Sequence, residues 1–191
     1  MILPILAYNH PNLRIKAEPV GKDYPDLPQL LEDMWETLRK SDGVGLAAPQ
    51  INKSIKLFIV DARHYESKFP ETKNFAKVFI NPEIIKMSEE TIYYPEGCLS
   101  VPGIYEDVDR PKTITINYFD ENWQEHTDTY TTIIARIIQH EYDHLDGILF
   151  PDRLPMVRKV LIKKKLDNIN KGNVNIDYPM IFSNKKKIKQ S

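Results

Sequence analysis

An isoleucine-rich segment in the second half of the chain most constrains the fold. Residues 133–146 carry large apolar side chains at helical spacing, and Gly147 follows them. These side chains are Ile133, Ile134, Ile137, Ile138 and Leu145. A surface helix buries one apolar stripe, whereas this segment is apolar around most of its circumference. We therefore expect a central helix that other elements surround.

The rest of the chain predicts two further helices and several strands. An N-terminal helix is expected over 27–41, where Asp26 can cap it, and a C-terminal helix over 155–170. The inner face of the C-terminal helix is expected to hold Val157, Val160 and Leu161. The strands are expected at 55–60, 77–84, 113–119 and 123–130, with a hairpin turn at 120–122. Because strands and helices do not alternate regularly, the pattern indicates an α+β fold, with antiparallel or mixed sheets packed around the central helix.

Length and charge limit the organisation and the partners of the chain. At 191 residues it suits a single domain, which we expect over 1–172, with a loosely held tail over 173–191. The net charge of −1 provides no basic field that would attract nucleic acid or lipid, and we expect the lysines at 163–165 and 185–187 to be solvated. We find no membrane span or signal peptide, and a single cysteine fits a reducing compartment, so we expect a cytoplasmic protein.

The stretch QHEYDH, residues 139–144, lies on the expected central helix. His140 and His144 are one turn apart on one face and can bind the same metal ion. Glu141 points about 100° away from His140, so it can approach a water molecule on the metal without binding the metal itself. The alternative is a chance spacing of two histidines. The apolar surroundings favour a metal pocket that excludes water.

A catalytic metal ion needs a third protein ligand and an open position for water, whereas a closed structural zinc site has four ligands. The other three histidines of the chain have no local pattern that predicts inward placement. The only cysteine, Cys98, lies in PEGCLSVPG, where glycines and prolines shape the backbone. A lone cysteine is often a small buried apolar residue. Because the histidine pair lacks a partner, we predict Cys98, His140 and His144 as the ligand set.

A further segment, GVGLAAPQ at residues 43–50, follows the first helix. Its glycines permit close backbone approach, although a plain tight turn is an alternative. Together with EGCLS (96–100) and QHEYDHLDG (139–147), it resembles the three signature motifs of the peptide deformylases, in the same order. The resemblance covers roughly residues 2–170, and the C-terminal helix is similar to the deformylase class that ends in one. The stretch 63–77 is longer than that class suggests.

The resemblance implies an enzyme that removes the formyl group from N-formylmethionine at the start of nascent polypeptides and releases formate. Metal-bound hydroxide would attack the formyl carbon, with Glu141 as general base and later acid. The family pattern assigns stabilisation of the oxyanion to the side-chain amide of Gln50 and the backbone N–H of Leu99. The implied cofactor is one divalent ion, Fe2+ in the cell, with Zn2+, Ni2+ or Co2+ in purified protein.

The resemblance also implies partners and a compartment. The partners would be nascent formylated polypeptides, met at the ribosome, without a specific nucleic acid and without a membrane. We expect a monomer in the bacterial cytoplasm, with an organellar origin as the alternative.

The resemblance places the methionine side chain of the substrate in a pocket formed by Val44, Tyr94, Ile133 and Ile137. The two isoleucines as plain core residues are an alternative that is partly compatible with this role. The backbone at Gly45 and around Cys98, including Gly97, is suited to bind an extended peptide like an added strand.

Glu96 and Arg110 are expected to form an ion pair that braces the metal-binding loop, with Arg110 as an ordinary surface charge as the alternative. Two rival functions are a zinc peptidase of the HExxH type and a metal-stabilised module that binds RNA through its lysines. Such peptidases usually take their third ligand from downstream of the helix, whereas Cys98 lies upstream.

Overall fold

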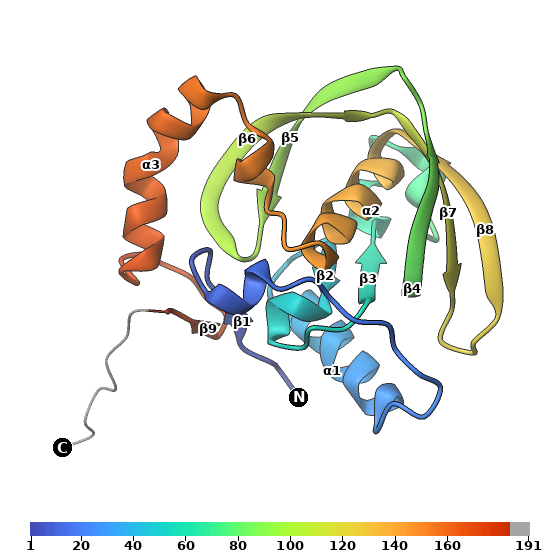
Figure 1. Ribbon diagram of the computed structural model, residues 1–191. Coiled ribbons are helices and arrows are strands. Elements are labelled where there is room, and N and C mark those ends of the chain that lie inside the picture. The colour runs from blue at the N-terminus through green and yellow to red at the C-terminus, as the bar shows by residue number, and fades with distance from the viewer. Residues whose placement is uncertain (184–191) are drawn as a thin grey trace.

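Helix α2 (Thr132–Leu145) lies at the centre of the computed structural model, which describes residues 1–183 (Figure 1). Its residues are all buried except Thr132 and Tyr142, which are half-buried. Strands of two antiparallel sheets pack against it. The isoleucine pattern thus predicts the central element correctly, and the α+β class is confirmed.

The larger sheet is antiparallel, with the strand order β2-β3-β4-β7-β8. These strands are β2 (Gly45–Ala47), β3 (Leu57–Asp61), β4 (Ala76–Met87), β7 (Thr113–Phe119) and β8 (Glu125–Thr131). In β7 every second residue (Ile114, Ile116 and Tyr118) is buried against the core, which is the period expected of a strand with one buried face. All four predicted strands fall in this sheet. The predicted hairpin turn is present as well, where Asp120 accepts hydrogen bonds from two backbone N–H groups.

A second, separate hairpin consists of β5 (Thr91–Cys98) and β6 (Val101–Pro111). Neither strand of this hairpin is among those expected from the sequence. In β6 the buried positions alternate between apolar and charged residues, so the usual apolar period is hidden. These positions are Ile104, Glu106, Val108 and Arg110. The hairpin therefore carries charged side chains inward: Arg110 bonds Asp143 of α2, and Glu106 pairs with Arg158 in the C-terminal helix.

The two outer helices differ from the predictions in detail. Helix α1 (Leu27–Lys40) forms, but Asp26 does not cap it through its side chain, because this residue adopts a left-handed conformation with φ 54°. Helix α3 (Met156–Asn170) lies at the periphery (Figure 1) and buries only Ile162 and Ile169. The prediction for its inner face is wrong. Val157, Val160 and Leu161 are 71%, 64% and 62% exposed.

The segment after residue 172, expected to be loosely held, joins the fold as far as it is described. Strand β9 (Met180–Ile181) pairs in parallel with β1 (Ile5–Leu6). The predicted lysine cluster at 185–187 lies outside the described residues. Single 3-10 turns complete the fold: η1 (Pro11–Arg14), η2 (Ala48–Ile51), η3 (Arg63–Tyr65), η4 (Pro70–Thr72) and η5 (Phe150–Arg153). Within residues 1–183, no helix has the length and apolar character needed to cross a bilayer.

Candidate metal centre

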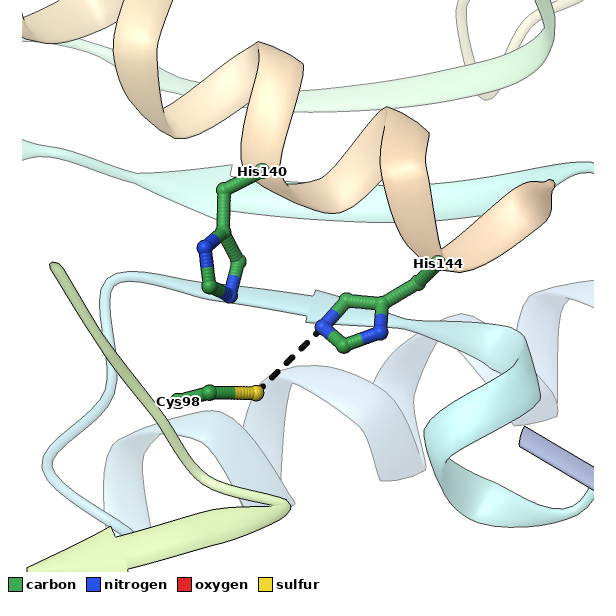
Figure 2. A group of neighbouring side chains, drawn as sticks. All are labelled: Cys98, His140 and His144. Carbon is green, nitrogen blue, oxygen red and sulfur yellow. Dashed lines mark hydrogen bonds between the residues drawn. The ribbon is translucent and has the colours of Figure 1, made fainter. Parts of the chain in front are cut away.

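Three side chains from two elements converge beside the middle of α2. Cys98 ends β5, and His140 and His144 lie one turn apart on α2. Figure 2 shows the sulfur and one ring nitrogen of each imidazole facing a shared space. Their ligand atoms all lie within 4.8 Å of one another, and Cys98 Sγ is 3.4 Å from His144 Nε2.

The residues fit a bound metal ion. Ligand bonds of about 2.0–2.3 Å in a tetrahedral arrangement leave the ligand atoms roughly 3.5 Å apart. The separation of Cys98 and His144 matches this spacing. One thiolate and two imidazoles suit Fe2+, Co2+, Ni2+ or Zn2+ better than Mg2+ or Ca2+. The structure therefore brings together the three predicted ligands in a geometry that can hold one ion.

The carboxylate of Glu96 orients one of these ligands. His140 Nδ1 lies 2.9 Å from Glu96 Oε2, and a proton shared there leaves Nε2 free to face the ion. Burial alone would lower the pKa of His140 in the metal-free protein, but the neighbouring Cys98 and Glu96 outweigh it and raise this pKa. Burial, together with His140 and Arg110, lowers the pKa of His144, which keeps that imidazole neutral, as a ligand must be.

Behind the ligands lies a buried group of charges that we call the inner cluster: Glu96, Arg110, Arg136 and Asp143. Arg110 donates to Glu96 and, at 2.8 Å, to Asp143, while Arg136 donates to Glu96 at 2.6 Å. Burial alone would raise the pKa of Glu96, but the hydrogen bonds from Arg110 and His140 lower it well below its usual range. The Arg110 side chain is 2% exposed, so it is no surface charge, and the predicted ion pair is present.

Two members of the inner cluster, Arg136 and Asp143, are not among the site residues predicted from the sequence. Arg136 had a usable signal, because it lies one turn before His140 within the isoleucine-rich segment. A charged side chain in a helix that is buried on most sides requires a partner of opposite charge. Arg136 also lies on the same face of the helix as His140 and His144, which places it near the metal site.

Glu141 is buried beside the ligands, and its Oε2 has no hydrogen-bond partner among the described residues. Burial raises the pKa of Glu141 to about 7 in the metal-free protein, with His140 as the largest opposing influence. Gly45 leaves room for this carboxylate, because a Cβ atom at residue 45 would lie 2.6 Å from Glu141 Cδ. The site thus contains a carboxylate with a free oxygen and a pKa suited to proton transfer near neutral pH.

The side-chain amide of Gln50 is held in one orientation. Its Oε1 accepts from the backbone N–H of Ala47 at 2.8 Å. Its Nε2 therefore faces the metal site, 3.6 Å from Cys98 Sγ and 3.2 Å from Ser100 Oγ. Leu99 follows the cysteine, and its carbonyl accepts a hydrogen bond from the hydroxyl of Tyr178. The Gln50 amide thus lies at the ligand set, and Leu99 is the chain neighbour of Cys98 and lines the same cavity.

A cavity of about 410 Å³ opens beside these groups. Most predicted site residues line it, and these are Val44, Gly45, Gln50, Glu96, Gly97, Cys98, Leu99, Ile133, Ile137, His140 and Glu141. Tyr65, Tyr105 and residues 175–178 line it as well, and none of these is predicted from the sequence. Tyr65 comes from the long stretch 63–77, which therefore supplies part of the cavity wall.

Tyr94, predicted to form the substrate pocket, is not among the described residues that line this cavity. Its ring meets Phe69 edge to face and lies under the guanidinium of Arg136, and its hydroxyl accepts from Lys68. Tyr94 therefore supports the wall from outside.

Comparisons with known proteins agree with this geometry. Residues 2–160 match the family model described as polypeptide deformylase. The peptide deformylase of Christiangramia forsetii is 48% identical over 98% of this chain and 99% of its own length, and that of Cytophaga hutchinsonii is 42% identical over 97% and 100%. Among solved structures, a Plasmodium falciparum peptide deformylase superposes with a TM-score of 0.79 at 36% identity, covering 88% of this chain and 95% of its own. A Legionella pneumophila peptide deformylase gives 0.79 at 34% identity, covering 91% and 98%.

Proposed function

Because this chain belongs to the peptide deformylase family, metal-dependent hydrolases that remove the N-formyl group from nascent peptides, we propose roles in that reaction for its individual residues. Membership in this family decides against an HExxH peptidase and against a binding module without activity. One observation carries the proposal. The free carboxylate oxygen of Glu141 lies beside three converging metal ligands and a cavity that can admit a peptide.

We propose that Cys98, His140 and His144 hold the divalent ion. When bound, the ion lowers the pKa of a coordinated water molecule towards neutrality and thereby supplies the nucleophile. Glu141 takes up the proton that this water releases and later delivers it to the departing amine. Nε2 of Gln50 and the backbone N–H of Leu99 donate to the oxyanion that forms on the formyl group.

The substrate is proposed to bind as an extended strand between two free sheet edges. Strand β2, which begins at Gly45, is an edge of the larger sheet, and β5, which contains Gly97, pairs only with β6 among the described strands. Their unpaired backbone groups can hydrogen-bond a peptide between them. Val44, Ile133 and Ile137 then offer an apolar surface to the methionine side chain.

Formate release from formyl-Met-Ala-Ser tests the role of Glu141. We expect the Glu141→Gln variant to lose about 10²- to 10⁴-fold in kcat while it keeps its metal and its fold. The matched control is Glu106→Gln, which changes another buried carboxylate that pairs with Arg158 and does not line the cavity. This control should keep wild-type turnover. A Glu141→Gln enzyme with wild-type kcat would remove the proposed base.

We propose Fe2+ as the native ion, with Zn2+, Ni2+ or Co2+ in its place in purified protein. A thiolate ligand adds negative charge to the ion and weakens its Lewis acidity, so the identity of the metal matters. Oxidation of iron or of Cys98 should lower activity during purification in air. Equal and stable turnover with zinc and with iron in air would contradict this proposal.

We further propose that the protein acts as a monomer in the bacterial cytoplasm and meets nascent chains at the ribosome, without a specific nucleic-acid site. Its substrates exist where polypeptides are synthesised, which supports this location. Light scattering of the purified protein tests the monomer. Sedimentation with ribosomes that carry formylated chains, compared with empty ribosomes, tests the encounter.

A further inference from the structure

The C-terminal segment reaches the catalytic cavity. Residues 175–178 line it, although they lie beyond the part of the chain that matches the family model. Within this segment, the hydroxyl of Tyr178 donates to the backbone carbonyl of Leu99 at 2.8 Å. Tyr178 is half-buried and packs against the apolar cluster that also includes Leu38 and Leu46. A tyrosine from the end of the chain thus contacts the residue that follows a metal ligand.

The chain is anchored both before and after Tyr178, which limits where its hydroxyl can lie. On the C-terminal side, β9 pairs with β1, and the N–H groups of Ile5 and Ala7 donate to Pro179 and Ile181 at 2.9 and 2.8 Å. On the N-terminal side, Val174 packs against the cluster that contains Ile169 of α3. These anchors lower the entropic cost of holding the tyrosine at Leu99.

In the chain, Leu99 lies between two residues whose side chains have partners in the site. Cys98 is a metal ligand, and Ser100 is fully buried and accepts a hydrogen bond from Gln50. The hydrogen bond from Tyr178 adds a constraint on the backbone of Leu99 itself. With its carbonyl fixed on one side and Cys98 fixed on the other, the N–H of Leu99 keeps one direction. An oxyanion donor is effective when its direction is set before the reaction begins.

We propose that Tyr178 is a positioning residue for deformylation, which fixes the carbonyl of Leu99 and thereby aims its N–H at the developing oxyanion. This inference rests on the proposed role of Leu99 and makes the C-terminal segment a functional part of the catalytic domain. Tyr178 acts through Leu99, so it should affect the transition state more than the binding of substrate.

The Tyr178→Phe variant removes only the hydroxyl and tests this inference. We expect kcat for formyl-Met-Ala-Ser to fall about three- to tenfold, as the loss of one neutral hydrogen bond predicts, with KM unchanged. Hydrogen–deuterium exchange of the backbone amides in residues 97–101 should become faster. The control is Tyr130→Phe, which removes the hydroxyl of another half-buried tyrosine that does not line the cavity, together with its hydrogen bonds to Lys77, Tyr118 and Asp128. This control should leave both readouts unchanged.

Wild-type kcat together with wild-type exchange in Tyr178→Phe would overturn the inference. A loss confined to KM would also overturn it, because the tyrosine would then act in substrate binding. The kcat of the Glu141→Gln variant, compared with that of the wild type, tests the proposed function separately. A large difference in that pair, with no change in Tyr178→Phe, would retain the proposed base and reject only the positioning role.

Discussion

This protein contains two hydrogen-bonded groups of polar and charged side chains that are similar in composition but differ in burial. The inner cluster lies behind the proposed metal ligands, and its Glu96 and Arg110 side chains are 4% and 2% exposed. A second group, which we call the outer cluster, joins β4, β7 and β8 and consists of Lys77, Tyr118, Asp128 and Tyr130. Its Lys77 and Asp128 side chains are 39% and 36% exposed.

The difference in burial determines how much each cluster contributes to stability and whether it can orient a neighbouring side chain. Water screens the charges of the outer cluster, so each of its ion pairs contributes little to stability. In the inner cluster, each charge depends on its partners because no water can replace them. Of the two clusters, only the inner one touches a proposed metal ligand, through Glu96 and His140. A rigid and fully paired group of charges can therefore hold the imidazole in one orientation.

The largest effect is expected from Glu96→Gln. This change leaves Arg110 and Arg136 buried without their main counter-charge. It also replaces one of the two acceptor oxygens that Arg110, Arg136 and His140 share with an NH2 group. We expect the free energy of unfolding to fall by about 3–5 kcal/mol and the metal affinity by roughly 10- to 100-fold. Urea unfolding of the metal-free protein and competition with a chelator measure the two quantities. A loss below about 1 kcal/mol would place the inner cluster on a level with the outer one.

A paired comparison at Asp143 sharpens the role of burial. Both Arg110 and Arg153 donate to this carboxylate, but the Arg153 side chain is 40% exposed. We expect Arg110→Ala to destabilise the fold by about 2–3 kcal/mol, less than Glu96→Gln because Arg136 still pairs with Glu96. Arg153→Ala should cost less than about 1 kcal/mol. Equal losses in urea unfolding would show that burial does not set the value of these bonds.

The smallest effect is expected in the outer cluster, and it depends on pH. Burial alone would raise the pKa of Asp128, but hydrogen bonds from Tyr130, Tyr118 and Lys77 outweigh it and lower this pKa. A carboxylate whose pKa is lower in the folded state stabilises the fold above its unfolded pKa, and the contribution is lost as the pH falls through the folded one. Asp128→Asn should therefore be less stable by at most about 1 kcal/mol at pH 7.

This difference between Asp128→Asn and wild type should shrink as the pH falls below about 4, where carboxylates become protonated. Thermal unfolding at pH 7 and at pH 3 measures it. A difference that grows on acidification would mean that the carboxylate of Asp128 is not the stabilising form.

The central helix and the histidine pair follow from the sequence because their signals are local, whereas Cys98 is predicted only as the partner that the pair lacks. Periodic isoleucines define α2, and the spacing of His140 and His144 has a direct meaning on a helix. The strand β6 is hidden because some of its inward charges, such as Glu106, find partners far along the chain, in this case Arg158. Pairing across the chain cannot be seen in a local pattern.

The error at α3 and the omission of Tyr178 have other causes. Apolar residues occur on several sides of α3, and periodicity could not select Ile162 and Ile169 over Val157 and Val160. The partner of Tyr178 is a backbone carbonyl, which every residue has, so no sequence signal marks Leu99 as its acceptor.

The metal content of anaerobically prepared protein tests the convergence of Cys98, His140 and His144 most directly. We predict one divalent ion per chain in the wild type and in His64→Ala, because His64 is an exposed histidine on η3. Cys98→Ala and His144→Ala should each lose the ion after dialysis against a chelator that leaves the wild type loaded. A full complement of metal in either ligand variant would contradict the site described here.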